Sequence, residues 1–115
     1  MKESGFPQFG PFALDVDQRE LMRDGKSVRL APRDVDLLIF LVERAGRIVD
    51  KERLLTELWA GRVVEEGNIA RHIATLRQAL GDTAESPTYI ETVPKRGYRF
   101  IATVTARVGA KEEPA

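Results

Sequence analysis

The sequence contains no cysteine, and its apolar runs are short. Without cysteine the chain cannot form disulfides, thiolate metal sites or cysteine nucleophiles. The longest apolar run, Val35 to Val42, is interrupted by Asp36 and is far shorter than the roughly 20 residues needed to cross a bilayer. The N-terminus lacks the apolar segment of a secretory signal. These absences fit a cytoplasmic location, which we expect for the chain.

Features that enzymes use are also scarce. The chain has one histidine, no glycine-rich phosphate loop and no spacing typical of metal ligands. The adjacent carboxylates of Glu65 and Glu66 would not face each other on a helix. We therefore expect no enzymatic activity, no bound metal and no cofactor.

Net charge is absent as well, since 18 basic residues balance 18 acidic ones. Because DNA-binding modules often have a clearly basic total, this balance argues mildly against nucleic-acid binding. The distribution of charge matters more than its sum, however. Acids load the first third of the chain, whereas bases gather later, at Arg71, Arg77, Lys95, Arg96 and Arg99. We expect a polarised molecule with modest non-specific affinity for polyanions.

The 115 residues are enough for one hydrophobic core but not for two. A composition of 43% hydrophobic and 31% charged residues is ordinary for a soluble globular protein. The patterns along the chain place one domain at residues 9–105, between a flexible lead-in at 1–8 and a linker or tail at 106–115.

The N-terminal part of this domain has the pattern of a small sheet. From Phe12 to Asp17 apolar and polar residues alternate, which is the period of a half-buried strand. Asp24-Gly25 is a strong hairpin-turn signal. The domain therefore opens with two or three short antiparallel strands, which need helices to pack against.

Two helices are predicted in the middle of the chain. Pro32 suits the first position of a helix, where its missing N–H costs nothing, and Gly46 suits the end. After a short extended link at residues 48–49, Asp50 is a good N-cap for the second helix. That helix should end at Gly61.

A third helix, at about residues 64–80, has two contrasting faces. At about 100° per residue, one face is an apolar stripe of Ile69, Ile73, Leu76 and Leu80. The opposite face has hydrogen-bonding side chains and no acid: Asn68, Arg71, Thr75 and Gln78. Such a helix suits a DNA major groove, where base edges offer donors and acceptors between walls of phosphate. The alternative is an ordinary amphipathic surface helix.

Two strands are predicted after this helix, at residues 89–93 and 98–104. The connection between them, Pro94 to Gly97, is a four-residue hairpin turn with two adjacent cations, Lys95 and Arg96. A cationic hairpin that follows a helix-turn-helix pair is a wing.

Three segments carry a resemblance to a known family: residues 50–59 (DKERLLTELW), 72–82 (HIATLRQALGD, with VEE shortly before it) and 90–100 (IETVPKRGYRF). In this order the chain resembles the winged-helix DNA-binding domain of OmpR/PhoB-type bacterial transcription regulators, from about Phe9 to Val104. Its wing and its lack of a receiver domain are more similar to CadC-type one-component regulators. In those proteins the domain is N-terminal and a membrane, repeat or ATPase portion often follows, so the resemblance allows a parent protein anchored in the membrane by a later segment.

The resemblance implies an α+β winged helix-turn-helix fold, with a four-stranded N-terminal sheet, three helices and a C-terminal hairpin. It implies that the third helix enters the major groove of double-stranded DNA and that the wing (90–104) lies at the minor groove. The loop at residues 60–66 corresponds to a region implicated in contact with RNA polymerase. Many relatives form tandem dimers on DNA, whereas we expect a monomer without DNA.

Two departures from the family pattern bear on DNA contact. Gly67 stands where response-regulator members often have a long polar or basic side chain. Pro94 stands where some members carry the wing arginine, so that Lys95 and Arg96 must supply the minor-groove cation.

The candidate DNA-binding residues are Asn68, Arg71, His72, Thr75, Arg77, Lys95, Arg96 and Arg99. Arg71 is the leading base reader, because a guanidinium can bind guanine O6 and N7 together. Asn68 either pairs with adenine or caps the helix. Thr75 either touches a thymine methyl or phosphate, or is a passive surface residue.

The other candidates suit phosphates better than bases. His72 and Arg77 flank the outward face, but His72 can instead be a neutral histidine packed on the second helix. Arg99 can reach a phosphate. Lys95 and Arg96 contact DNA or simply keep an edge hairpin soluble, and Trp59 is expected in the core.

The leading hypothesis is sequence-specific binding of double-stranded DNA for transcription regulation. The alternative is a winged-helix protein–protein interaction module. Salt separates the two, since DNA binding weakens steeply with ionic strength and an apolar protein interface does not.

Overall fold

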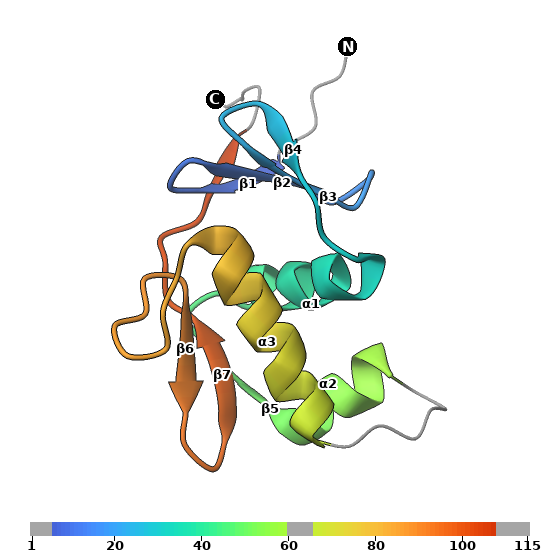
Figure 1. The fold of residues 1–115 in the computed structure, drawn as a ribbon, viewed down its shortest axis with the longest axis vertical. Coiled ribbons are helices and arrows are strands. Elements are labelled where there is room, and N and C mark those ends of the chain that lie inside the picture. The colour runs from blue at the N-terminus through green and yellow to red at the C-terminus, as the bar shows by residue number, and fades with distance from the viewer. Residues whose placement is uncertain (1–5, 60–65, 108–115) are drawn as a thin grey trace, which may run out of the picture.

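The computed structural model describes residues 6–59 and 66–107 (Figure 1). The elements run in the order β1 (Phe6–Phe9), β2 (Phe12–Asp15), β3 (Glu20–Arg23), β4 (Lys26–Val28), α1 (Pro32–Glu43), β5 (Ile48–Asp50), α2 (Lys51–Leu58), α3 (Glu66–Leu80), β6 (Ile90–Val93), β7 (Gly97–Phe100) and β8 (Thr105–Arg107). This α+β arrangement of an N-terminal sheet, three helices and a C-terminal hairpin confirms the predicted fold class. Within the described ranges, no helix is long and apolar enough to cross a membrane.

The first sheet is antiparallel and has five strands in the order β4-β3-β2-β1-β8. Four N-terminal strands were implied by the family resemblance, and β8 joins them from the far end of the chain. The predicted turn between β3 and β4 is confirmed, because Asp24 and Gly25 both have the positive φ values, 50° and 82°, that a tight hairpin requires.

The predicted domain boundaries, residues 9 and 105, both fall inside strands of this sheet. Residues 6–8, expected in a flexible lead-in, belong to β1, and residues 106–107, expected in a tail, belong to β8. Neither strand has an alternating pattern, and each is stabilised by pairing with the other and, for β1, with β2. The remainder of the expected lead-in and tail lies outside the described residues.

α1 and α2 begin where expected, but both end earlier. Pro32 occupies the first turn of α1, as predicted, and the helix ends at Glu43 rather than near Gly46. Gly46, with φ 87°, instead turns the chain toward β5 and donates its N–H to the carbonyl of Phe100 at 2.8 Å. Asp50 is the N-cap residue of α2, although its side chain makes no capping hydrogen bond. α2 ends at Leu58, with Trp59 as its C-cap residue, earlier than the expected stop at Gly61, a residue that itself lies outside the described ranges.

The segment predicted as an extended link is a strand. β5 pairs with β7, so that the wing hairpin belongs to a three-stranded sheet of order β5-β7-β6. Because Val93 pairs with Gly97, the turn contains three residues rather than four. It is a type II turn, with Pro94 first, Lys95 at φ 64° and the N–H of Arg96 bonded to the carbonyl of Val93 at 3.0 Å.

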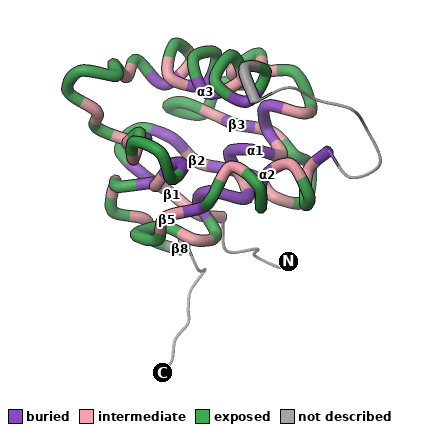
Figure 2. The backbone as a smooth tube through the Cα atoms, turned by 90° about the horizontal axis from the view of Figure 1, so that it is seen from below, coloured by how far each residue is buried: buried purple, intermediate pink, exposed green. Residues whose placement is uncertain are grey.

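An aromatic cluster joins the two sheets. The ring of Phe9 meets Phe100 edge-on at 5.0 Å, and Phe12 meets Tyr89 edge-on at 5.6 Å. Such pairs add to the free energy gained by burying the rings. The cluster continues into a core formed by α1 and the inner side of α3, whose outer side is largely exposed (Figure 2).

We predict that Gly97→Ala will lower the free energy of unfolding by at least about 2 kcal/mol, as overpacking does. A Cβ at this position would lie 1.9 Å from the carbonyl oxygen of Val49, so β5 and β7 would have to separate. Urea denaturation followed by circular dichroism measures the change, with exposed Thr103→Ala as the control. Equal stability of the Gly97 variant and the wild type would contradict the close approach of these strands.

Candidate nucleic-acid interface

The predicted division of α3 into two faces is present in the structure. Its apolar stripe is buried against α1 and the rest of the core, with no member more than 3% exposed: Ile69, Ile73, Leu76 and Leu80. The opposite face is exposed: Asn68, Arg71, Thr75 and Gln78. Burying the stripe therefore turns hydrogen-bonding groups without a carboxylate toward solvent.

A polar contact at the meeting point of the three helices fixes how α3 is oriented. Nδ1 of His72 lies 2.5 Å from Oδ1 of Asp34 on α1, whose side chain is only 7% exposed. The His72 ring also lies 5.4 Å from the ring of Trp59, directly after α2. Trp59 is buried, as predicted for a core residue. One ring nitrogen of His72 is thus used within the protein, as expected if this residue packs on the second helix.

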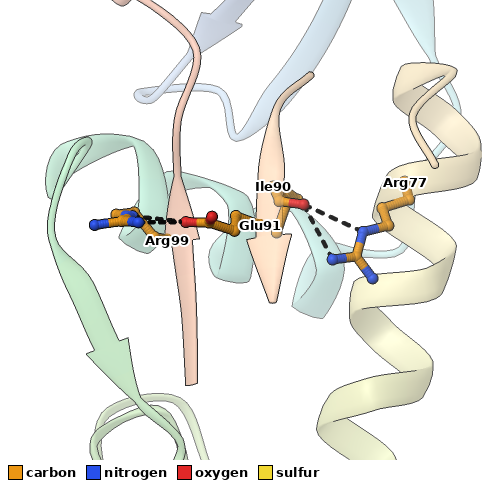
Figure 3. Close-up of polar contacts among 4 residues, drawn as sticks. All are labelled: Arg77, Ile90, Glu91 and Arg99. Atoms are coloured by element: carbon orange, nitrogen blue, oxygen red, sulfur yellow. Dashed lines mark hydrogen bonds and ion pairs between the residues drawn. The ribbon is translucent and has the colours of Figure 1, made fainter. Parts of the chain in front are cut away.

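Arg77 points from α3 to the wing rather than to open solvent (Figure 3). Its Nε and Nη2 donate to the carbonyl of Ile90 at 3.3 and 3.0 Å, and Nη2 donates to the Thr92 hydroxyl at 2.7 Å. The predicted phosphate ligand therefore binds β6 in the free protein.

Arg99 is also paired within the protein. Its Nε and Nη2 donate to one carboxylate oxygen of Glu91, at 2.8 and 2.6 Å, across the β6–β7 pair (Figure 3). This ion pair offsets the charge of Arg99, because the two groups lie on facing strand positions.

Lys95 and Arg96 are exposed at the tip of the wing. Among the described residues neither takes part in an ion pair, so both charges are available to a partner. The wing tip and the N-terminal end of α3 lie toward the same end of the molecule (Figure 1). The structure thus brings Asn68 and Arg71 to the same end as the two wing cations.

Asp82 is a structural residue that sequence reasoning treated only as part of the helix stop. Its carboxylate accepts backbone N–H bonds from Thr88, Tyr89 and Ile90, at 2.6, 3.1 and 2.9 Å. Burial acts to raise the pKa of Asp82, but these hydrogen bonds outweigh it, and the pKa lies below its usual value. The Gly-Asp pair after the helix signals the stop, whereas no local pattern signals the partners of Asp82, which lie just before β6 and at its first residue.

This fold, with an outward polar helix face and a cationic hairpin, defines the winged-helix class of DNA-binding domains. The chain matches the family described as "Transcriptional regulatory protein, C terminal" over residues 25–100, and it belongs to that family. The OmpR/PhoB-type assignment and its CadC-like character are thereby confirmed.

Curated relatives agree with this assignment. The chain is 36% identical over 96 residues to the transcriptional activator CadC of Escherichia coli, covering 83% of this chain and 19% of CadC. It is 39% identical over 92 residues to the transcriptional regulator HilA of Salmonella typhimurium, covering 80% of this chain and 16% of HilA. The chain thus spans less than a fifth of the length of these relatives.

Solved structures show the same fold. The DNA-binding domain of E. coli CadC superposes with a TM-score of 0.76 at 28% identity, covering 91% of this chain and 99% of that one. The DNA-binding domain of Klebsiella pneumoniae RstA, solved in complex with the RstA box, gives 0.72 at 35% identity, covering 82% of this chain and 94% of that one.

The pKa of Asp82 leads to a prediction about acid stability. Because the folded-state pKa is lowered, the ionised carboxylate stabilises the fold at pH values above the unfolded pKa of about 3.9. That contribution is lost as the pH falls through the folded pKa. We therefore expect Asp82→Asn to destabilise the protein more at pH 6 than at pH 3.

Urea denaturation of both proteins across this pH range measures the difference. Exposed Glu85→Gln serves as the control, because Glu85 belongs to the same loop. A constant gap between Asp82→Asn and the wild type would show that the three backbone hydrogen bonds do not depend on the charge.

Proposed function

We propose that this chain regulates transcription by binding double-stranded DNA at specific sequences, with α3 in the major groove and the β6–β7 wing at the adjacent minor groove. The observation that carries the proposal is the exposed face of α3, which has donors and acceptors and no acid over Asn68–Leu80. A carboxylate on that face would repel the phosphates that line the groove. The RstA complex supports the proposal, because that related domain was solved with its DNA box.

The exposed residues divide into base readers and backbone ligands. Arg71 is the main base-reading residue, since its guanidinium can bind guanine O6 and N7 together. Asn68 and Thr75 contribute further base contacts from the same face of α3. Lys95 and Arg96 supply cations to the minor groove. These assignments rest on exposure and, for Asn68, Arg71 and the two wing cations, on the position of their elements toward one end of the molecule.

His72, Arg77 and Arg99 each have part of the side chain already used within the protein. The described contacts take Nδ1 of His72 and the Nε and Nη2 of both arginines. Contact of His72 or Arg99 with phosphate would therefore use Nε2 or Nη1, respectively.

Narrower parts of the proposal rest on the family resemblance and on the sequence. We propose that the loop at residues 60–66, most of which lies outside the described residues, contacts RNA polymerase. We further propose a monomer without DNA and a tandem dimer on direct repeats. We also propose a cytoplasmic location, no enzymatic activity, and one domain that includes β1 and β8 in addition to the expected residues 9–105.

The test is fluorescence anisotropy on a random duplex library at two salt concentrations, with sequencing of the bound fraction. We expect an enriched half-site and an affinity that falls steeply with salt, because phosphate contacts release counterions. Binding that ignores salt would favour a protein-interaction module, and no binding at low salt would refute the DNA function of this chain.

Two substitutions separate base recognition from contact with the DNA backbone and groove. Arg71→Ala should lower the affinity for the selected site by about 1–3 kcal/mol and change binding to random DNA much less. Arg96→Ala should lower the two affinities more evenly than Arg71→Ala does, because a wing cation has no bidentate contact with a base and senses sequence only through the width of the minor groove. Exposed Gln78→Ala is the matched control on α3. Equal losses on both DNAs for Arg71→Ala would show that this residue only binds phosphate.

A further inference from the structure

Arg77, near the C-terminal end of α3, and Asp82, just after it, bind the backbone carbonyl and N–H of one wing residue, Ile90. Ile90, the first residue of β6, donates its N–H to Asp82 at 2.9 Å and accepts Arg77 at its carbonyl, at 3.0 and 3.3 Å. The N–H of Asp82 donates in turn to the carbonyl of Arg77 at 2.7 Å. The helix end and the start of the wing are therefore linked in a closed set of hydrogen bonds, which we call the Arg77–Asp82 clasp.

The clasp extends to a second position on the wing. Arg77 also binds the hydroxyl of Thr92, two residues further along β6. Contacts at two positions on one strand resist rotation of that strand about the helix end. The turn with Lys95 and Arg96 begins two residues after Thr92, so a rotation at β6 moves the wing tip.

The chemistry of the contacts indicates a positioning role. The partners of Arg77 are a carbonyl and a hydroxyl, both neutral, so in the described residues its charge is not offset by a carboxylate. What these contacts use is the planar, forked geometry of the guanidinium, which a lysine ammonium lacks. Arg77 is partly buried, whereas Arg71, earlier on the same helix, is exposed.

We propose that Arg77 is a positioning residue that sets the angle between α3 and the wing, and that it thereby determines preference for the base pairs flanking the major-groove site. The inference rests on the proposed DNA-binding function. Minor-groove width depends on sequence, and a cation reads it only when it is held at a fixed place. A wing held loosely would still meet phosphates but would discriminate less between flanking sequences.

The decisive variant is Arg77→Lys, which keeps the positive charge but replaces the planar, forked guanidinium with an ammonium group. If Arg77 positions the wing, the lysine variant should lose flanking preference as fully as Arg77→Ala, while preference within the major-groove site remains. If Arg77 acts as a phosphate ligand, lysine should restore most of the affinity on every sequence, and the proposal is overturned. Thr92→Val, which removes one partner without changing charge, should weaken flanking preference in the same direction.

A double-mutant cycle with the wing cation gives a second result. Arg96→Ala should reduce affinity for the selected site roughly tenfold in the wild type, as loss of a charged hydrogen bond does. In the Arg77→Lys background, Arg96→Ala should reduce this affinity less than about twofold, because the effects of mutations at residues that act as a unit do not add. Additive losses would contradict the proposal. Arg71→Ala is the control and should have the same effect in both backgrounds.

Amide hydrogen exchange in the free protein tests the clasp without DNA. In Arg77→Lys and Thr92→Val the amides of residues 90–97 should exchange faster, while those of α1 remain unchanged. Unchanged exchange along the hairpin would overturn the positioning role. A wild type that selects no sequence would instead refute the DNA function, and the exchange rates would still show whether Arg77 holds the wing.

Discussion

The structure depends on the burial of one apolar stripe, that of α3, against α1. Each of its four aliphatic side chains is at most 3% exposed, and burial of such a side chain is worth about 1.5–3 kcal/mol. Since the stripe and the polar face are opposite sides of the same helix, packing decides which groups face outward. The contact of His72 with Asp34 adds a directional constraint at the crossing of the helices. Packing of the apolar stripe thus decides which side chains of α3 are offered to a partner, and these exposed side chains can vary without loss of the fold.

Charge in this domain is divided between architecture and binding. Arg77 and Arg99, which a count of basic residues assigns to DNA, bind the carbonyl of Ile90 and the carboxylate of Glu91. Lys95 and Arg96 form no ion pair in the described part of the chain. A net charge of zero over 115 residues is therefore compatible with DNA binding. The wing tip, which holds these two cations, lies toward the same end of the molecule as the N-terminal end of α3 (Figure 1).

Local patterns predicted the local features well. The two faces of α3, the start of α1 at Pro32 and the turn at Asp24-Gly25 each follow from the periodicity or backbone preference of neighbouring residues. What the sequence did not reveal depends on partners distant in the chain. β1 and β8 are strands because they pair across the whole domain, and β5 is a strand because β7 lies beside it. The internal partners of Arg77 and Arg99 could not be predicted for the same reason, since the sequence does not distinguish an arginine that binds a phosphate from one that binds a carbonyl or carboxylate of its own chain.

The pairing of β1 with β8 has a mechanical consequence. Phe6, the first residue of β1, lies opposite Arg107, the last residue of β8, so the chain enters β1 and leaves β8 at the same end of this strand pair. A force that pulls the two ends apart would load the hydrogen bonds of the pair one after another, as in a zipper, rather than all at once in shear. Under such tension β8 would detach while the helices and the wing keep their packing. The domain would then yield first at the sheet that lies farthest from the wing tip (Figure 1).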